Sequence, residues 1–216
     1  HEIKTPITAI KGFAETLLGG AIDDKENAPR FLQTIKNHSE RLNSLVEDLL
    51  TLSRIEFGDI KIEKTAVSLD DVIDTVFTTL RNKAGIKGIY LKKEIPENLG
   101  EIKADKNRLT QILLNLVDNG IKFTETGEVT VRVKSEEKEN LIEISVEDTG
   151  IGIPQKHLSR LGERFYRVDS SRSRELGGTG LGLAIVKHLV KAHGWEMKIE
   201  STQGKGTKAR IFCPIC

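Results

Sequence analysis

The sequence contains few cysteines, few aromatic residues and almost no net charge. Its 2 cysteines, Cys213 and Cys216, form a Cys-x-x-Cys pair at the chain end, without the strand-then-helix context of a redox site. Its 33 basic and 32 acidic residues leave a net charge of +1, which argues against nucleic acid or an acidic lipid surface as partner. No apolar run approaches the ~18 residues that cross a bilayer, and there is no signal-peptide pattern.

Length and composition predict a soluble globular protein with one large or two small domains. The chain has 216 residues, of which 38% are hydrophobic and 30% charged, enough for a sizeable core and a solvated surface. Because the first residue is His1 rather than methionine, we expect a cytoplasmic fragment whose upstream part is missing.

Residues 1–60 are predicted to form a helical hairpin. Two helical patterns are separated by Gly19 and Gly20, and Pro29 suits the start of the second helix. Apolar residues recur at heptad spacing in both helices, and His38 shares their seam: Ile3, Ile7, Ile10, Ala14 and Leu17, then Phe31, Ile35, Leu42, Leu45, Leu49 and Leu52. A lone hairpin cannot cover so long a stripe, so we expect a homodimeric four-helix bundle.

Residues 61–216 are predicted to form an α+β domain. Ser68 opens an amphipathic helix, residues 89–91 have the pattern of a strand, and Asp105 caps a second helix. Alternating apolar residues predict antiparallel strands at 129–133 and 141–146, and a closing strand pair at 195–199 and 209–213. Helices are expected on one face of a mixed sheet.

The stretch from Gly177 to Gly182 has four glycines in six residues and leads into an apolar helix. Glycines let a ligand approach the backbone, and a helix N-terminus offers unpaired N–H groups and a positive dipole end, so phosphate is the expected ligand. The stretch fits neither the P-loop nor the dinucleotide fingerprint. At this point a plain hinge before the helix is an equal alternative.

The helix after Asp105 carries polar residues on the face opposite its apolar one. Asn115, Asn119 and Lys122 lie there, where amide oxygens suit Mg²⁺ and an ammonium suits phosphate. An ordinary solvated face is the alternative.

Asp148 directly follows an apolar strand and precedes Gly150 and Gly152. The glycines would let a flat ligand approach a carboxylate at the strand end, for which an adenine amino group is a good partner. A simple turn is the alternative.

Taken together, these stretches resemble the catalytic core of a sensor histidine kinase of two-component signalling, over essentially the whole chain. Residues 1–6 are similar to the phosphoacceptor box, 115–124 to the N box, 148–154 to the first glycine box, 164–167 to the F box, 178–182 to the second glycine box and 204–207 to a third. Gly120 departs from the more usual alanine. The resemblance implies a dimerisation and phosphotransfer hairpin over 1–60 and an ATP-binding α/β sandwich over 61–216, of the type shared with heat-shock-90 chaperones and gyrase.

The resemblance also implies roles for individual residues. His1 would accept the phosphoryl group, Glu2 would orient the imidazole and take its proton, and Thr5 would place water for dephosphorylating the partner. Arg167 would stabilise charge on the γ-phosphate, and Asn119 with Asn115 would ligate Mg²⁺. The implied ATP-binding residues are Asn115, Asn119, Lys122, Phe123, Asp148, Gly150, Gly152, Ile153, Tyr166, Arg167, Gly178, Thr179, Gly180, Leu181, Gly182 and Thr207.

The expected activity is ATP-dependent autophosphorylation of a histidine, transfer to an aspartate of a response regulator, and phosphatase activity toward that regulator. The parent protein is expected in the bacterial inner membrane. One alternative is an ATP-hydrolysing machine of the chaperone or topoisomerase type, which would carry Glu where this chain has Asn115. Another is a binding module that holds ATP without catalysis, against which Glu2, Asn119 and Asp148 argue.

Overall fold

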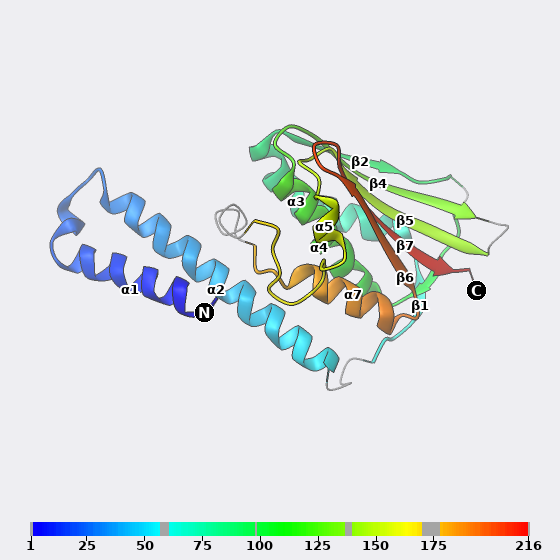
Figure 1. The fold of residues 1–216 in the computed structure, drawn as a ribbon, viewed down its shortest axis with the longest axis horizontal. Coiled ribbons are helices and arrows are strands. Elements are labelled where there is room, and N and C mark those ends of the chain that lie inside the picture. Colours follow the sequence, from blue (N-terminus) through cyan, green and yellow to red (C-terminus); the bar gives the residue numbers. More distant parts are fainter. Residues whose placement is uncertain (1, 57–60, 98, 137–139, 170–177, 216) are drawn as a thin grey trace.

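The computed structural model describes residues 2–56, 61–97, 99–136, 140–169 and 178–215. A helical hairpin projects from one side of an α/β sandwich (Figure 1). His1 and Cys216 lie outside the described residues, as do residues 57–60, so the predicted domain boundary at residue 60 stays a prediction.

The hairpin consists of α1 (Lys4–Leu18) and α2 (Ala28–Glu56), with the short 3-10 helix η1 (Ala21–Asp23) in the turn. The chain reverses at Gly20, whose φ of 115° is accessible mainly to glycine. Phe13 and Phe31 face each other across the hairpin with ring centroids 5.5 Å apart. The predicted hairpin is thus confirmed.

The sandwich has a five-stranded sheet in the order β2-β4-β5-β7-β6. The strands are β2 (Ile89–Glu94), β4 (Gly127–Glu136), β5 (Leu141–Asp148), β6 (Glu196–Thr202) and β7 (Gly206–Pro214). Only the pairing of β2 with β4 is parallel within this sheet, and the predicted antiparallel pairs β4–β5 and β6–β7 are confirmed.

Cys213 in β7 is buried, which raises the pKa of its thiol to about 12 and argues against redox chemistry there.

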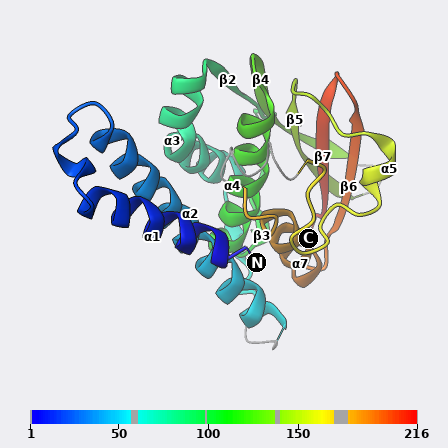
Figure 2. The same ribbon diagram turned by 60° about the vertical axis from the view of Figure 1, so that its left-hand side comes forward.

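Helices α3 (Leu69–Lys87), α4 (Lys106–Phe123) and α7 (Gly182–Ala192) cover one face of this sheet, and the short α5 (Gln155–Leu158) lies near its β6 edge (Figures 1 and 2). Both predicted caps are present: the side chain of Ser68 accepts a hydrogen bond from the Asp71 N–H, and that of Asp105 accepts one from the Arg108 N–H.

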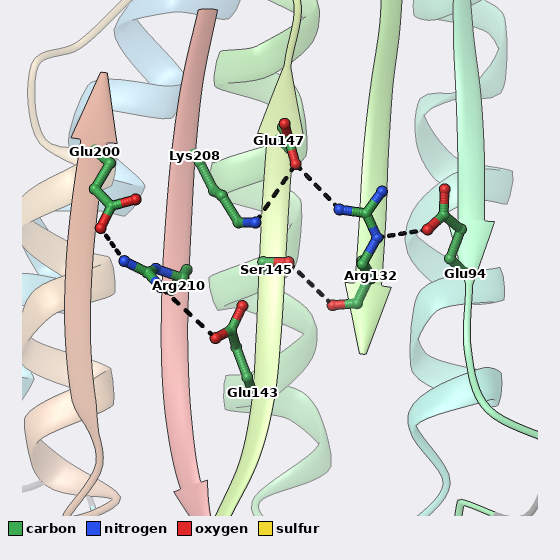
Figure 3. A network of polar contacts seen from close by, with 8 residues as sticks. All are labelled: Glu94, Arg132, Glu143, Ser145, Glu147, Glu200, Lys208 and Arg210. Carbon is green, nitrogen blue, oxygen red and sulfur yellow. Dashed lines mark hydrogen bonds and ion pairs between the residues drawn. The ribbon is translucent and has the colours of Figure 1, made fainter. Parts of the chain in front are cut away.

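The opposite face of the sheet carries charged side chains instead of a second layer of helices (Figure 3). Arg132 lies between Glu94 and Glu147, and Glu147 also pairs with Lys208. Further along, Arg210 bridges Glu143 and Glu200. The alternating charges explain why this face can remain in contact with water.

One hydrophobic cluster joins the sandwich to the hairpin. Leu45 and Leu52 of α2 are buried together with Ile185 and Leu189 of α7. A two-stranded sheet of β1 (Thr65–Val67) and β3 (Ile102–Ala104), absent from the sequence prediction, completes the junction. No helix among the described ranges is both long and apolar enough for a membrane span.

Candidate functional site

A cavity of about 440 Å³ lies between α4, the start of α7, the end of β5 and the flank of α2. The predicted residues that line it are Asn115, Asn119, Lys122, Phe123, Asp148, Gly152, Ile153, Tyr166, Arg167, Gly178, Thr179, Gly180, Gly182 and Thr207. Gly150 and Leu181 lie outside this lining. The tertiary structure therefore brings together residues from five separate sequence motifs.

Asp148 lies at one end of the cavity, where its carboxylate is fixed by backbone groups. Its Oδ1 accepts hydrogen bonds from the N–H groups of Gly150, at 2.9 Å, and Thr207, at 3.2 Å. Burial raises the pKa of the Asp148 carboxyl, although these two hydrogen bonds oppose the rise. Both contacts use Oδ1, so Oδ2 remains an acceptor for a ligand. A donor such as the adenine amino group would suit it.

Glycine is required beside Asp148 because the backbone there is crowded. Gly152 has a φ of 64°, and a Cβ on it would lie 2.0 Å from the carbonyl oxygen of Thr202. A Cβ on Gly150 would lie 2.4 Å from the carbonyl oxygen of Phe123. Gly150 thus supports the position of Asp148 without lining the cavity itself.

The polar face of α4 forms a second wall. The Nζ of Lys122 lies 2.7 Å from Asp118 Oδ2, and Lys83 of α3 pairs with the other oxygen of Asp118. Burial raises the pKa of Asp118, but the two lysines outweigh this effect and hold it below its ordinary value. Asn115 lies against the start of α7, since a Cβ on Gly182 would be 3.1 Å from Asn115 Oδ1.

The segments around Phe165 and Thr179 are joined by backbone contacts. The Phe165 N–H donates to the Gly180 carbonyl oxygen at 3.0 Å, and Arg167 Nη2 donates to the Thr179 carbonyl oxygen at 3.0 Å. Phe165 has a φ of 61°, an uncommon conformation for a bulky residue. Leu181 is fully buried and anchors the start of α7 in the core. These contacts hold the F-box and second-glycine-box segments together.

Tyr166 is fixed by His157 of α5 and by Arg160, which follows that helix. Its hydroxyl lies 2.6 Å from His157 Nδ1, and the Arg160 guanidinium lies 4.0 Å from the centre of its ring. These contacts keep the Tyr166 ring at the cavity wall.

Arg167 also reaches the first residues of the hairpin. Its Nη2 lies 2.8 Å from Glu2 Oε2, and Arg41 of α2 contacts the same oxygen at 3.2 Å. The Arg167 side chain is only 6% exposed, and its Nε has no hydrogen-bond partner among the described residues. Thr5 is exposed on α1. The structure therefore brings Arg167 and Glu2 together, whereas the predicted phosphoacceptor His1 lies outside the described residues.

Three residues of the hairpin line the cavity and were missed from the sequence: Ser44, Glu47 and Asp48 of α2. Asp48 Oδ2 accepts a hydrogen bond from Thr179 Oγ1 at 2.7 Å. Their helical spacing beside the leucine seam is a weak signal, because many exposed helix faces carry such residues.

The residues present fit a nucleotide with Mg²⁺. Asp148 offers an acceptor at one end, the two asparagines of α4 offer amide oxygens for a hard cation, and Lys122 offers an ammonium for phosphate. The buried Nε of Arg167 adds a donor without a described protein partner. The first turn of α7 has no side-chain cap, which leaves backbone N–H groups for an anion.

Known families match both parts of the chain. Residues 104–215 match the family described as histidine kinase-, DNA gyrase B- and HSP90-like ATPase, and residues 1–58 match the His Kinase A (phospho-acceptor) domain. The chain is 37% identical over 215 residues to the sensor histidine kinase WalK of Bacillus subtilis, an alignment that covers 99% of this chain and 35% of that protein. It thus spans about a third of this relative's length.

Solved structures of histidine kinases share the fold. Full-length ShkA in complex with AMPPNP is 30% identical with a TM-score of 0.75, over 88% of this chain and 39% of that one. The histidine kinase ThkA in complex with the response regulator protein TrrA is 25% identical with a TM-score of 0.79, over 100% of this chain and 59% of that one.

Proposed function

The chain belongs to the sensor histidine kinases of two-component signalling, and we propose that it transfers the γ-phosphoryl group of ATP to His1 and then to an aspartate of a response regulator. The observation that carries this proposal is the position of Arg167, which lines the cavity and contacts Glu2, the neighbour of His1 in the sequence. Nucleotide site and phosphoacceptor segment are thereby linked within one chain.

In this proposal, Asp148 binds the adenine amino group through Oδ2, while Lys122 and the start of α7 bind phosphate oxygens. Asn119 and Asn115 hold Mg²⁺, which neutralises phosphate charge. Bound ATP supplies the phosphoryl group.

Glu2 and Arg167 are the residues proposed to assist phosphoryl transfer at the hairpin. The two guanidinium groups of Arg41 and Arg167 hold the Glu2 carboxylate in place, so that it can accept the ring proton of the neighbouring His1. Arg167 also offers donors toward charge on the transferring group. Thr5, on the exposed side of α1, is assigned to positioning water for phosphatase activity toward the regulator.

The partners follow from the hairpin. Ile3 at the N-cap of α1, Ile7 of α1 and Leu32 of α2 are exposed by 41%, 48% and 55%, which supports burial of the hairpin against a second copy of the chain. We propose a homodimer through the hairpin, with an aspartate-bearing regulator as the phosphoryl acceptor. The ThkA complex with a response regulator supports this class of partner.

The test is to incubate the chain with radiolabelled ATP and to measure acid-labile phosphate. Glu2→Gln is expected to lower labelling at least tenfold, within the range for loss of a general base. Glu15→Gln, an exposed change on the α1 helix that follows Glu2, is the matched control and should leave labelling unchanged. Equal labelling of the Glu2 and Glu15 variants would contradict the role of Glu2, and no labelling of the unaltered chain would contradict the function.

Thr5→Ala separates the phosphatase step from the kinase step. We expect near-normal labelling of the kinase and slower loss of phosphate from a phosphorylated regulator. If Thr5 only stabilises α1, both activities should fall together with the thermal midpoint.

A further inference from the structure

A carboxylate of the hairpin lies at the wall of the nucleotide cavity. Asp48 lies on α2, yet it lines the cavity with Lys122, Asn115 and Thr179. Its neighbour Glu47 also reaches the lining but is exposed, whereas Asp48 is half-buried. Asp48 belongs to none of the nucleotide-binding motifs, so its presence there calls for a physical explanation.

Thr179 is held between the hairpin and the sandwich. Its hydroxyl donates to Asp48 Oδ2 at 2.7 Å and accepts from the Leu181 N–H at 3.2 Å. Its carbonyl oxygen accepts from Arg167 at 3.0 Å. Asp48 is therefore fixed beside the start of α7, where the proposed function places phosphate oxygens.

The position of Asp48 is costly for a negative charge. Burial is the main cause of a raised pKa for this carboxyl, and the hydrogen bond from Thr179 and the charge of Lys122 only partly offset it. A phosphate chain bound at Lys122 would add further negative charge close to a carboxylate that water screens poorly. Each added phosphate charge should increase this repulsion.

We propose that Asp48 is a specificity-determining residue of the nucleotide site, and that its carboxylate disfavours nucleotides in proportion to the charge of their phosphate chain while α2 is docked on the sandwich. The inference rests on the proposed function, because it takes this cavity as the ATP site. Coupling between two binding events is reciprocal, so ATP must weaken the contact of Asp48 with Thr179 as much as that contact weakens ATP binding. Binding of ATP would thus favour separation of α2 from the nucleotide segment.

Calorimetric titration of the full chain with adenosine, ADP and ATP tests this inference. Asp48→Asn keeps an oxygen that can accept from Thr179 and removes only the charge. We expect this variant to bind ATP about tenfold more tightly, ADP with a smaller gain, and adenosine unchanged. Glu40→Gln removes a charge from an exposed part of the same helix, away from the cavity lining, and should change none of the three affinities.

The same titrations of Asp48→Ala and of the unaltered chain distinguish the possible explanations. Tighter ATP binding by Asp48→Ala but not by Asp48→Asn would show that the hydrogen bond matters and the charge does not, which overturns the inference. Equal gains for all three ligands, or weaker ATP binding in Asp48→Asn, would overturn it as well. Normal ATP binding with no effect of either variant would leave the proposed function standing and remove only the role of Asp48. Failure of the unaltered chain to bind any of the ligands would instead remove the proposed function.

Discussion

At the scale of single residues, Asp148 shows opposing demands of stability and binding. Its pKa lies above the ordinary value of 3.8 because of burial, so its charge lowers the stability of the folded protein at neutral pH. An amide at this position could still accept the hydrogen bonds from Gly150 and Thr207, but it would present an altered group to the adenine that we propose binds here.

Asp148→Asn is therefore expected to raise the free energy of unfolding by roughly 0.5 to 2 kcal/mol while removing the preference for ATP over GTP. The stability gain should be complete at neutral pH. It should shrink as pH falls through the raised folded-state pKa toward the unfolded-state value near 3.8, because the wild-type carboxyl then becomes neutral. Denaturant titrations at several pH values and nucleotide titrations measure both effects. A variant that is less stable yet still selects ATP would contradict this account.

At the scale of elements, Gly120 sets how closely α4 approaches the sheet. A Cβ on Gly120 would lie 3.0 Å from both methyl carbons of Val129 in β4. From the sequence alone, this glycine is only a departure from the more usual alanine. The structure adds a packing reason, since the buried methyl groups of Val129 can move little.

Gly120→Ala tests whether the gain in helix propensity is larger or smaller than the cost of overpacking against Val129. Alanine gains about 1 kcal/mol in helix propensity, whereas overpacking typically costs about 1 to 3 kcal/mol, so we expect a net loss of roughly 1 kcal/mol. In a Val129→Ala background the same change should instead stabilise the protein. Chemical denaturation of the four proteins of this cycle gives the answer. Equal effects of Gly120→Ala in both backgrounds would contradict the contact.

His193 connects α7 with the start of α4. Its Nε2 accepts from the Asp105 N–H at 3.2 Å, and its Nδ1 lies 2.8 Å from the Leu189 carbonyl oxygen, so the neutral ring satisfies both contacts. Trp195 stacks on this ring with centroids 4.2 Å apart. Burial is the main cause of a lowered pKa for His193.

A lowered folded-state pKa means that the unfolded chain binds the proton more readily. The stability contributed by neutral His193 should be complete above the ordinary pKa of 6.5 and decrease as pH falls below it. His193→Gln is expected to flatten this dependence between about pH 7.5 and pH 5, as measured by thermal unfolding. His188→Gln is the comparison: the pKa of His188 is also lowered, mainly by burial, so this change should flatten the same pH dependence without removing the hydrogen bond between His193 and Asp105. An unchanged slope in the His193 variant would refute the assignment.

At the scale of the whole molecule, the docking of α2 depends on buried leucines. Leu52 is 2% exposed within the cluster that includes α7, whereas Leu18 at the end of α1 is 84% exposed. Leu52→Ala is expected to cost about 2 to 5 kcal/mol, and Leu18→Ala less than about 0.5 kcal/mol. Calorimetric unfolding at fixed protein concentration measures both changes. Similar losses in the two variants would show that α2 is not packed on the sandwich as described.

The sequence by itself determined most of the local elements and pointed to the residues that we propose bind the nucleotide. Heptad spacing predicted α1 and α2, Ser68 and Asp105 marked helix starts, and Asp148 was correctly placed at a strand end. These features arise from periodicity, capping and turn chemistry, which depend on residues a few positions apart. Most of the predicted nucleotide residues line a single cavity, although the tertiary structure, and not a local pattern, brings them together.

Only the tertiary structure decided which distant groups meet. The strands β1 and β3 are too short to show a recognisable strand pattern in the sequence. They are defined by pairing with each other across a long sequence separation. The contacts of Asp48 with Thr179 and of Glu2 with Arg167 join residues separated by 131 and 165 positions. No local pattern encodes such contacts, because they result from burying the leucines of α2 against α7, and that packing brings the hairpin carboxylates to the nucleotide site.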